Sequence, residues 1–145
     1  MSKDENLKMV QGIVDELEVY ASGDYFLHNG ELFPIDKEEF KLIDGCSIDV
    51  DVYIMPDGEE IYEGNIESAT LFDYFNDFLD IDYVVDCEKQ YKGARVMVTC
   101  GGPNIYIDSY RGEVQLYWWN ERATAEIPAN TCDEINEVFR EFYYC

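Results

Sequence analysis

The chain has 145 residues, of which 47% are hydrophobic and 15% aromatic, a composition that supports a packed core and excludes an intrinsically disordered protein. Its 32 Asp and Glu residues outnumber its 10 Lys and Arg residues, which gives a formal net charge of −22. This charge would repel nucleic acid and anionic membranes, so we expect neither as a partner. The length predicts a single acidic domain spanning residues 1–145.

The N-terminal residues include no apolar stretch of the kind found in a signal peptide. No apolar run approaches the roughly 18 residues of a membrane-spanning helix, so we expect a cytoplasmic protein. The five cysteines are widely spaced and include no C-x-x-C pair, which is typical of reduced thiols. Since His28 is the only histidine, the sequence predicts no metal site and no cofactor.

In the first third of the chain, apolar residues such as Leu7 recur at three- and four-residue steps and predict a helix over residues 4–20. Ser2 and Glu5 form a possible capping box at its start, and Gly12 inside it indicates close packing or a slight bend. A hairpin is expected next, with strands 25–27 and 31–33 joined through Asn29-Gly30 and with His28 exposed in the turn. Residues 35–43 could form a short helix.

The middle of the chain begins with clean alternation over residues 47–55, which predicts a strand with Val52 and Ile54 on one face and Asp49, Asp51 and Tyr53 on the other. Pro56-Asp57-Gly58 predicts a turn, and residues 59–62 the returning strand. A helix is expected over residues 68–79, with Ser68 as its N-cap.

The second half has the pattern of a β-meander that ends in a helix. We expect turns at residues 91–93, 101–104 and 109–112, and a closing helix over 131–143 with Thr131 as its N-cap. The expected strands are 81–87, 95–100, 105–108, 114–118 and 123–127. The sequence therefore predicts an α+β fold: an antiparallel sheet of about five to seven strands with N-terminal, central and C-terminal helices packed on it.

One long window is free of basic residues. Between Lys41 and Lys89 there is no Lys, Arg or His, whereas fourteen Asp and Glu residues occur there. Apolar and aromatic residues are interleaved with these acids, so the segment can fold and hold its carboxylates in an ordered anionic surface. Residues 1–70 have a net charge of −14 and residues 71–145 one of −8, so we place the working face in the first half.

This anionic surface predicts a basic partner. Asp49 and Asp51, like Asp80 and Asp82, are two residues apart, which on a strand separates them by about 6.7 Å on one face. Such a ladder has the charge repeat of a nucleic-acid backbone and would suit a cleft that binds phosphates, although a solvated strand face remains the alternative. The predicted partner-binding residues are Asp49, Asp51, Asp57, Glu59, Glu60, Glu63, Asp73, Asp77, Asp80 and Asp82.

The sequence contains no G-x-G-x-x-G, P-loop, G-x-S-x-G or H-E-x-x-H motif, and we predict no catalytic residue. Carboxylate pairs also serve glycosidases and metal-dependent nucleases, but 32 acids make chance pairs certain. A small carboxylate-dependent nuclease or hydrolase therefore remains an alternative. It would lose activity through one substitution, whereas distributed electrostatic binding would decline gradually.

Residues 101–108 read GGPNIYID, and GEV at 112–114 and LYWW at 116–119 follow. With the closing helix, this string resembles a group of small acidic proteins carried on phages and mobile elements of Gram-positive gut bacteria; the resemblance covers roughly residues 71–145. It implies a setting in which such proteins disarm host defence, as anti-CRISPR or antirestriction proteins. We therefore expect a non-enzymatic DNA mimic that occupies the basic cleft of a nuclease such as Cas9. An immunity protein for a basic toxin is a further alternative.

Overall fold

The computed structural model describes the backbone of residues 3–35, 40–44, 49–76, 78, 80–99 and 102–145, and the side chains of the same residues except 40–44, 49–51 and 63. Contacts divide the chain into two compact units. Unit 1 comprises residues 1–21 and 70–145, and unit 2 comprises residues 22–69. The predicted single domain stays a prediction, and each unit is described by itself.

Unit 1 is built on a five-stranded antiparallel sheet in which sequence neighbours pair throughout, in the order β10-β9-β8-β7-β6. The predicted meander is therefore confirmed. Its register is continuous between β8 and β9 and between β9 and β10, while the pairs β6–β7 and β7–β8 each contain one irregularity. The strands are β6 (Ile81–Val85), β7 (Tyr91–Thr99), β8 (Asn104–Asp108), β9 (Glu113–Trp118) and β10 (Glu121–Glu126).

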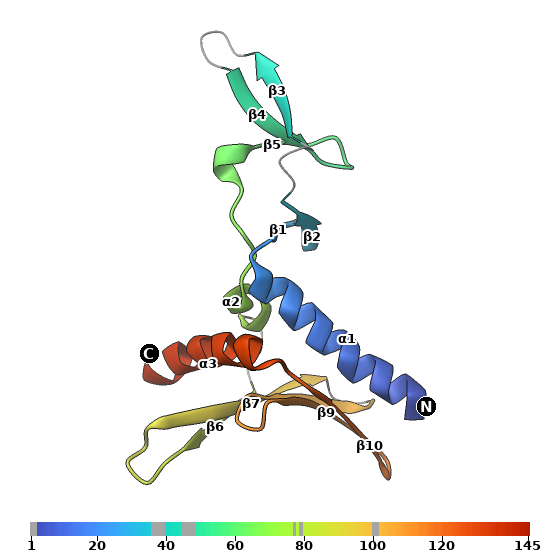
Figure 1. Ribbon diagram of the computed structural model, residues 1–145, viewed down its shortest axis with the longest axis vertical. Helices are drawn as coiled ribbons and strands as arrows, with labels where there is room; N and C mark the ends of the chain where they lie inside the picture. The colour runs from blue at the N-terminus through green and yellow to red at the C-terminus, as the bar shows by residue number, and fades with distance from the viewer. Residues whose placement is uncertain (1–2, 36–39, 45–48, 77, 79, 100–101) are drawn as a thin grey trace. The chain divides into compact units, whose positions relative to one another are not determined.

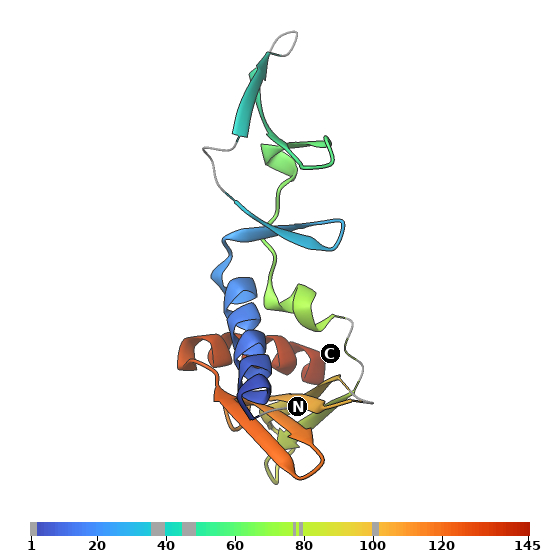
Figure 2. The ribbon, with the colours of Figure 1, turned by 90° about the vertical axis from the view of Figure 1, so that its right-hand side faces the viewer.

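Helices cover one face of this sheet. Figures 1 and 2 show α1 (Lys3–Ser22) and α3 (Ala129–Tyr144) on the same side of it. Their buried residues, together with those of the short α2 (Leu71–Phe75), form one core with alternate residues of the strands. The α+β class with N-terminal, central and C-terminal helices is thus confirmed. The members of this core with no exposed surface are Val10, Leu17, Phe75, Ala94, Val96, Ile107, Val114, Leu116, Ile135 and Phe139.

The buried stripe of α1 differs from the prediction at its first turn. Asn6 is buried there, whereas Leu7 is 45% exposed. The Asn6 side-chain amide donates to a carboxylate oxygen of Glu121 at 2.8 Å, so a contact with the β10 strand sets the rotation of the helix. Among the described residues, no atom beyond the local helix backbone lies within 4 Å of a Cβ built on Gly12, so of the two expectations for this glycine the close packing is wrong. The predicted cap residue Ser2 lies outside the described residues.

Both later helices begin at other residues than predicted. Thr70, not Ser68, is the N-cap of α2, and it forms a capping box with Asp73. The closing helix begins at Ala129 after Pro128, so Thr131 is a buried residue inside it and the predicted cap is wrong. Proline suits a helix start because its fixed φ is already helical and it lacks the N–H that would go unpaired there.

The turn expected at residues 91–93 lies inside strand β7, which begins at Tyr91. The β6–β7 connection turns earlier, where the side chain of Asp86 accepts the backbone N–H groups of Glu88 and Gln90, both at 2.9 Å. Lys89 in this turn has a φ of 64°. An Asx-type turn therefore replaces the glycine turn that the sequence suggested.

Unit 2 consists of two small antiparallel sheets. The hairpin of β1 (Tyr25–His28) and β2 (Glu31–Pro34) is as predicted, with positive φ at Asn29 and Gly30. The second sheet has the order β3-β4-β5, formed by β3 (Phe40–Asp44), β4 (Asp49–Ile54) and β5 (Glu60–Tyr62). A short 3₁₀ helix, η2 (Glu63–Asn65), follows. The helix expected over residues 35–43 is therefore wrong at 40–43, where strand β3 pairs with β4; residues 36–39 lie outside the described residues.

A small aromatic cluster forms the core of unit 2. Phe26, Tyr53 and Met55 are buried, and the ring of Phe26 lies 5.4 Å from that of Tyr53 between centroids. Tyr53 was predicted to share a face with the acids of β4, and Ile54 was predicted to lie on the opposite, apolar face; instead Tyr53 is buried and Ile54 is exposed. Tyr53 and Met55 are two residues apart and share one face of the strand, so this face packs with Phe26 and buries the large aromatic surface.

Candidate functional site

Unit 2 is the most anionic part of the chain. Its 48 residues include 13 Asp and Glu residues and only two lysines, Lys37 and Lys41, so one third of the chain has half of the net charge of −22. Among its described side chains, the buried core cluster consists of Phe26, Tyr53 and Met55. A small fold with this charge is destabilised by its own repulsion, which the binding of a cationic partner would relieve.

The turn between β4 and β5, with the first residue of β5, presents three of the predicted contact residues. Asp57, Glu59 and Glu60 are all exposed. The turn is closed by two backbone hydrogen bonds, from the Met55 N–H to the Glu59 carbonyl at 2.8 Å and from the Gly58 N–H to the Met55 carbonyl at 2.9 Å. Asp49 and Asp51 are described by their backbone alone, paired with Asp44 and Leu42 respectively, and Glu63 by its place in η2.

Three predicted contact residues are described in unit 1, and Asp77 lies outside the described residues. Asp73 has a local role, since one of its carboxylate oxygens accepts the backbone N–H of Thr70 at 2.8 Å. Asp80 and Asp82 are exposed and line a cavity of about 350 Å³ together with Arg95 and Tyr106. Asp80 and Asp82 therefore share one surface, whereas the Asp73 carboxylate caps helix α2.

Arg95 lies on the sheet face opposite the helices, and its guanidinium stacks on the ring of Tyr106 at 3.6 Å from the centroid. Its Nε donates to the side-chain oxygen of Gln115 at 3.0 Å. The Gln115 amide in turn donates to Asp108 and Glu113. Arg95 is thus held by an aromatic ring and an amide, so it is not free to reorient toward a ligand.

Tyr117 also lies on this open sheet face, its ring 6.1 Å from that of Tyr106. Trp118 packs against the core, as its place in the alternation predicts. Trp119 is 87% exposed and has a φ of 56°, which places it in the turn that follows β9. An exposed tryptophan in a left-handed turn position is an uncommon feature, and tryptophan is enriched among residues that anchor protein interfaces.

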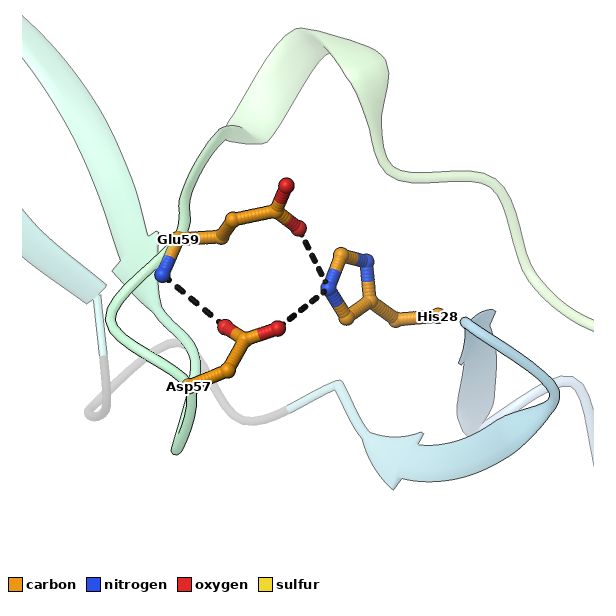
Figure 3. A group of neighbouring side chains, drawn as sticks. All are labelled: His28, Asp57 and Glu59. Atoms are coloured by element: carbon orange, nitrogen blue, oxygen red, sulfur yellow. Dashed lines mark hydrogen bonds and ion pairs between the residues drawn. The ribbon is translucent and has the colours of Figure 1, made fainter.

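His28 was predicted to be exposed in its turn, and the structure corrects this. It ends strand β1, its side chain is only 16% exposed, and its Nε2 faces two carboxylates of the β4–β5 turn. The distances from Nε2 are 2.7 Å to Oε2 of Glu59 and 3.5 Å to Oδ2 of Asp57 (Figure 3). Sequence reasoning missed this cluster because about thirty residues separate His28 from its partners.

Ion pairs neutralise some of the other carboxylates. Lys92 pairs with Asp86 at 3.8 Å, and Arg122 pairs with Glu113 at 3.6 Å. Both pairs belong to unit 1 and join residues on neighbouring parts of the sheet. The cations described in these pairs therefore serve the sheet of unit 1.

Cys132 is a half-buried thiol on α3. Burial raises the pKa of its thiol, and the neighbouring carboxylates Asp133 and Asp108 raise it further. Its Sγ donates to the Ser109 carbonyl at 3.3 Å. This thiol is therefore protonated at neutral pH and helps to attach α3 to the turn after β8.

Glu16 on α1 is the basis of a pH prediction. Desolvation raises the pKa of this carboxyl above its ordinary value of 4.5; the pKa values of Tyr20 and Tyr74 are raised by burial first and then by the charge of Glu16. A carboxyl whose pKa is raised by folding stabilises the fold when protonated, and this contribution is lost as the pH rises through the folded-state pKa. We therefore expect Glu16→Gln to raise the melting temperature at pH 7 and to leave it nearly unchanged below pH 4.5.

The check is thermal unfolding of both proteins across this pH range. Glu18→Gln is the matched control, because it removes one negative charge from another exposed side chain of the same helix. An equal gain from both variants at pH 7 would mean that relief of net charge, and not desolvation of Glu16, is the cause.

Within the described residues, no helix is both long and apolar enough to cross a membrane. Comparison of the chain with protein-family models, with curated proteins and with solved structures finds no match in any of the three.

Proposed function

We propose that this protein is an acidic inhibitor of the anti-CRISPR type, which occupies the basic nucleic-acid cleft of a host defence nuclease. The observation that supports this most is the concentration of negative charge in unit 2, which has 13 acidic residues and only two lysines. Three of these carboxylates, those of Asp57, Glu59 and Glu60, are exposed at the β4–β5 connection. A cleft that binds phosphates with Arg and Lys would attract such a surface and exclude DNA from it. The resemblance of residues 71–145 makes a Cas9-type effector the first target to test.

The proposed mechanism requires no chemistry on the inhibitor. Binding would proceed by electrostatic steering, followed by pairing of individual carboxylates with the basic side chains that otherwise contact phosphates. Exposed carboxylates on a short turn suit this role because they reach into a groove without rearrangement of the sheet behind them. The backbone bonds that close the β4–β5 turn keep the three carboxylates together when the protein is free.

The test is a comparison of two variants with equal net charge. The first replaces the six predicted contacts of unit 2 by their amides: Asp49, Asp51, Asp57, Glu59, Glu60 and Glu63. The second replaces six exposed acids on the helices and last strand of unit 1: Asp4, Glu18, Glu126, Glu134, Glu137 and Glu141. Both variants have a formal charge of about −16, so any difference between them reflects position and not total charge.

We expect the first variant to inhibit DNA binding by the effector about tenfold to a hundredfold less well, and the second to lose less than about threefold. The measurement is competition with labelled target DNA for the guide-loaded effector. Circular dichroism checks that both variants keep the fold. Equal losses of inhibition would mean that net charge alone causes the effect. No loss of inhibition in either variant would contradict the DNA-mimic proposal.

Salt is expected to act in opposite directions on binding and on folding. Raising the ionic strength screens the attraction between inhibitor and cleft, so the affinity should fall by about tenfold or more between 50 and 300 mM salt. The same screening relieves the self-repulsion of a chain with a net charge of −22, so the melting temperature should rise. Binding measured by calorimetry and unfolding measured in the same buffers check both signs. An affinity that ignores salt would contradict a charge-based interface.

A further inference from the structure

We propose that His28, Asp57 and Glu59 form a binding site for one divalent transition-metal ion of the zinc class. This inference stands apart from the proposed function, because it concerns the free protein. One ligand atom of each residue faces a common point, and these atoms all lie within 4.8 Å of one another. Figure 3 shows the imidazole approaching from the end of β1 and both carboxylates approaching from the β4–β5 turn.

The distances suit a metal ion. Ligand atoms that are each about 2.0–2.2 Å from a zinc ion in a tetrahedral site lie about 3.3–3.6 Å from one another. The separation of 3.5 Å between His28 Nε2 and Asp57 Oδ2 falls in this range. The Glu59 contact of 2.7 Å is shorter, and its side chain, which is 62% exposed, must move back by less than 1 Å. A flexible exposed glutamate can make such a shift at little cost.

The two other ligands are held in place before any ion binds. Oδ1 of Asp57 accepts the backbone N–H of Glu59 at 2.9 Å, which leaves Oδ2 directed at the imidazole. The His28 ring lies against Phe33, with 6.3 Å between ring centroids. Fixed ligands lose little conformational freedom on binding, which raises the affinity of a site.

The charges of the cluster are unbalanced without a cation. Two carboxylate oxygens face one ring nitrogen, and that nitrogen has at most one hydrogen to donate. A metal ion would accept the nitrogen lone pair and both carboxylates together, and the net charge of unit 2 would raise the local concentration of cations. One imidazole with two carboxylates favours Zn²⁺ or Mn²⁺ over Mg²⁺, which prefers oxygen ligands and keeps its water.

There is also room to complete the coordination shell. A cavity of about 200 Å³ adjoins the cluster and is lined by His28, Asp57, Glu31 and Met55, among others. Since a water molecule occupies about 30 Å³, the cavity can hold the one to three waters that a three-ligand site needs. The carboxylate of Glu31 in its wall can accept a hydrogen bond from such a water. An ion here would neutralise two predicted partner contacts, so metal binding would weaken the association proposed above.

The experiment uses the one histidine of the chain as its probe. Because His28 is the only histidine, the imidazole resonances in a ¹H–¹⁵N spectrum of the full chain report this site alone, even though the five thiols also take up Zn²⁺. We expect Zn²⁺ to shift the Nε2 resonance along a single-site saturation curve in free Zn²⁺ concentration, and Mg²⁺ at the same concentration to leave it unchanged. No shift with Zn²⁺, or an equal response to Mg²⁺, would overturn the proposal.

Variants distinguish Zn²⁺ binding by all three ligands from Zn²⁺ binding by the His28 imidazole alone. Loss of an outer-shell partner costs about 10- to 100-fold in metal affinity, and loss of a ligand should cost at least as much. We therefore expect Glu59→Gln and Asp57→Asn each to weaken the affinity for Zn²⁺ at least tenfold, measured as the free Zn²⁺ concentration at the midpoint of the Nε2 shift. The control is Asp80→Asn with Asp82→Asn, which removes two negative charges from unit 1 and should change the midpoint less than twofold. Equal weakening in control and ligand variants would assign the effect to diffuse counterions, which also overturns the site.

Discussion

Replacing Gly93 with alanine is expected to destabilise unit 1 by about 3 kcal/mol or more, because the backbone of another turn occupies the space that the new methyl group needs. A Cβ built on Gly93 would lie 2.4 Å from Cβ and 2.7 Å from Cα of Tyr110. The neighbouring Ser109 fixes this turn on β7: its N–H donates to the Ala94 carbonyl at 2.8 Å and its Oγ accepts the Ala94 N–H at 2.9 Å. The turn therefore has no room to withdraw without breaking buried hydrogen bonds.

Chemical denaturation followed by tryptophan fluorescence measures this effect, since Trp118 and Trp119 both belong to unit 1. Gly12→Ala is the matched control. It adds the same methyl group to a helix position where nothing lies within 4 Å, so it should stabilise the protein by about 0.5–1 kcal/mol. A Gly93→Ala protein as stable as the parent would mean that the close approach of the turn and β7 is wrong.

Truncating Phe139 to alanine is expected to cost about 3–5 kcal/mol of unfolding free energy. Phe139 is fully buried where α3 meets α2, and its ring centroid lies 4.6 Å from that of Phe75 and 6.3 Å from that of Phe142. Its loss would leave a cavity at the centre of the core that joins three helices and the sheet. Because domains are stable by only about 5–15 kcal/mol, this one change can remove most of the stability of unit 1.

The matched control is Phe72→Ala on α2, which removes the same ring from a side chain that is 45% exposed. The Phe72 ring contacts Phe142 at 5.5 Å between centroids, so the expected cost is about 1 kcal/mol, contributed mainly by that aromatic pair. Urea denaturation of both variants gives the two values. Similar costs for the two would contradict the placement of Phe139 at the centre of the core.

The elements of unit 1 were largely predictable because their signals are local. Apolar steps of three and four residues identified α1 and α3, and short β-prone runs between turn residues identified the meander. Boundaries were less predictable, since they depend on which polar group reaches a free backbone N–H. Thr70 caps α2 with Asp73, and Asp86 makes the β6–β7 turn, although other residues nearby had similar propensities.

The candidate site was predictable in part. The turn at Asp57 followed from the Pro-Asp-Gly motif, with Glu59 and Glu60 at the start of the returning segment, and the excess of negative charge followed from composition. The role of His28 did not, because the sequence pattern of a hairpin turn says nothing about which other turn packs against it. Strand β3 was mistaken for a helix for a related reason: its pairing with β4 supplies backbone hydrogen bonds that local propensity does not report.

By itself the sequence determined the net charge, the base-free window, the α+β class and the existence of the terminal helices, because charge is additive and helix and strand periods are properties of adjacent residues. Only the tertiary structure decided three further contacts: the carboxylates of the β4–β5 turn face His28, the turn at Tyr110 crosses Gly93, and Asn6 meets Glu121. Each of these joins residues more than fifteen positions apart. Such contacts depend on how whole elements pack together, and no short stretch of sequence specifies that packing.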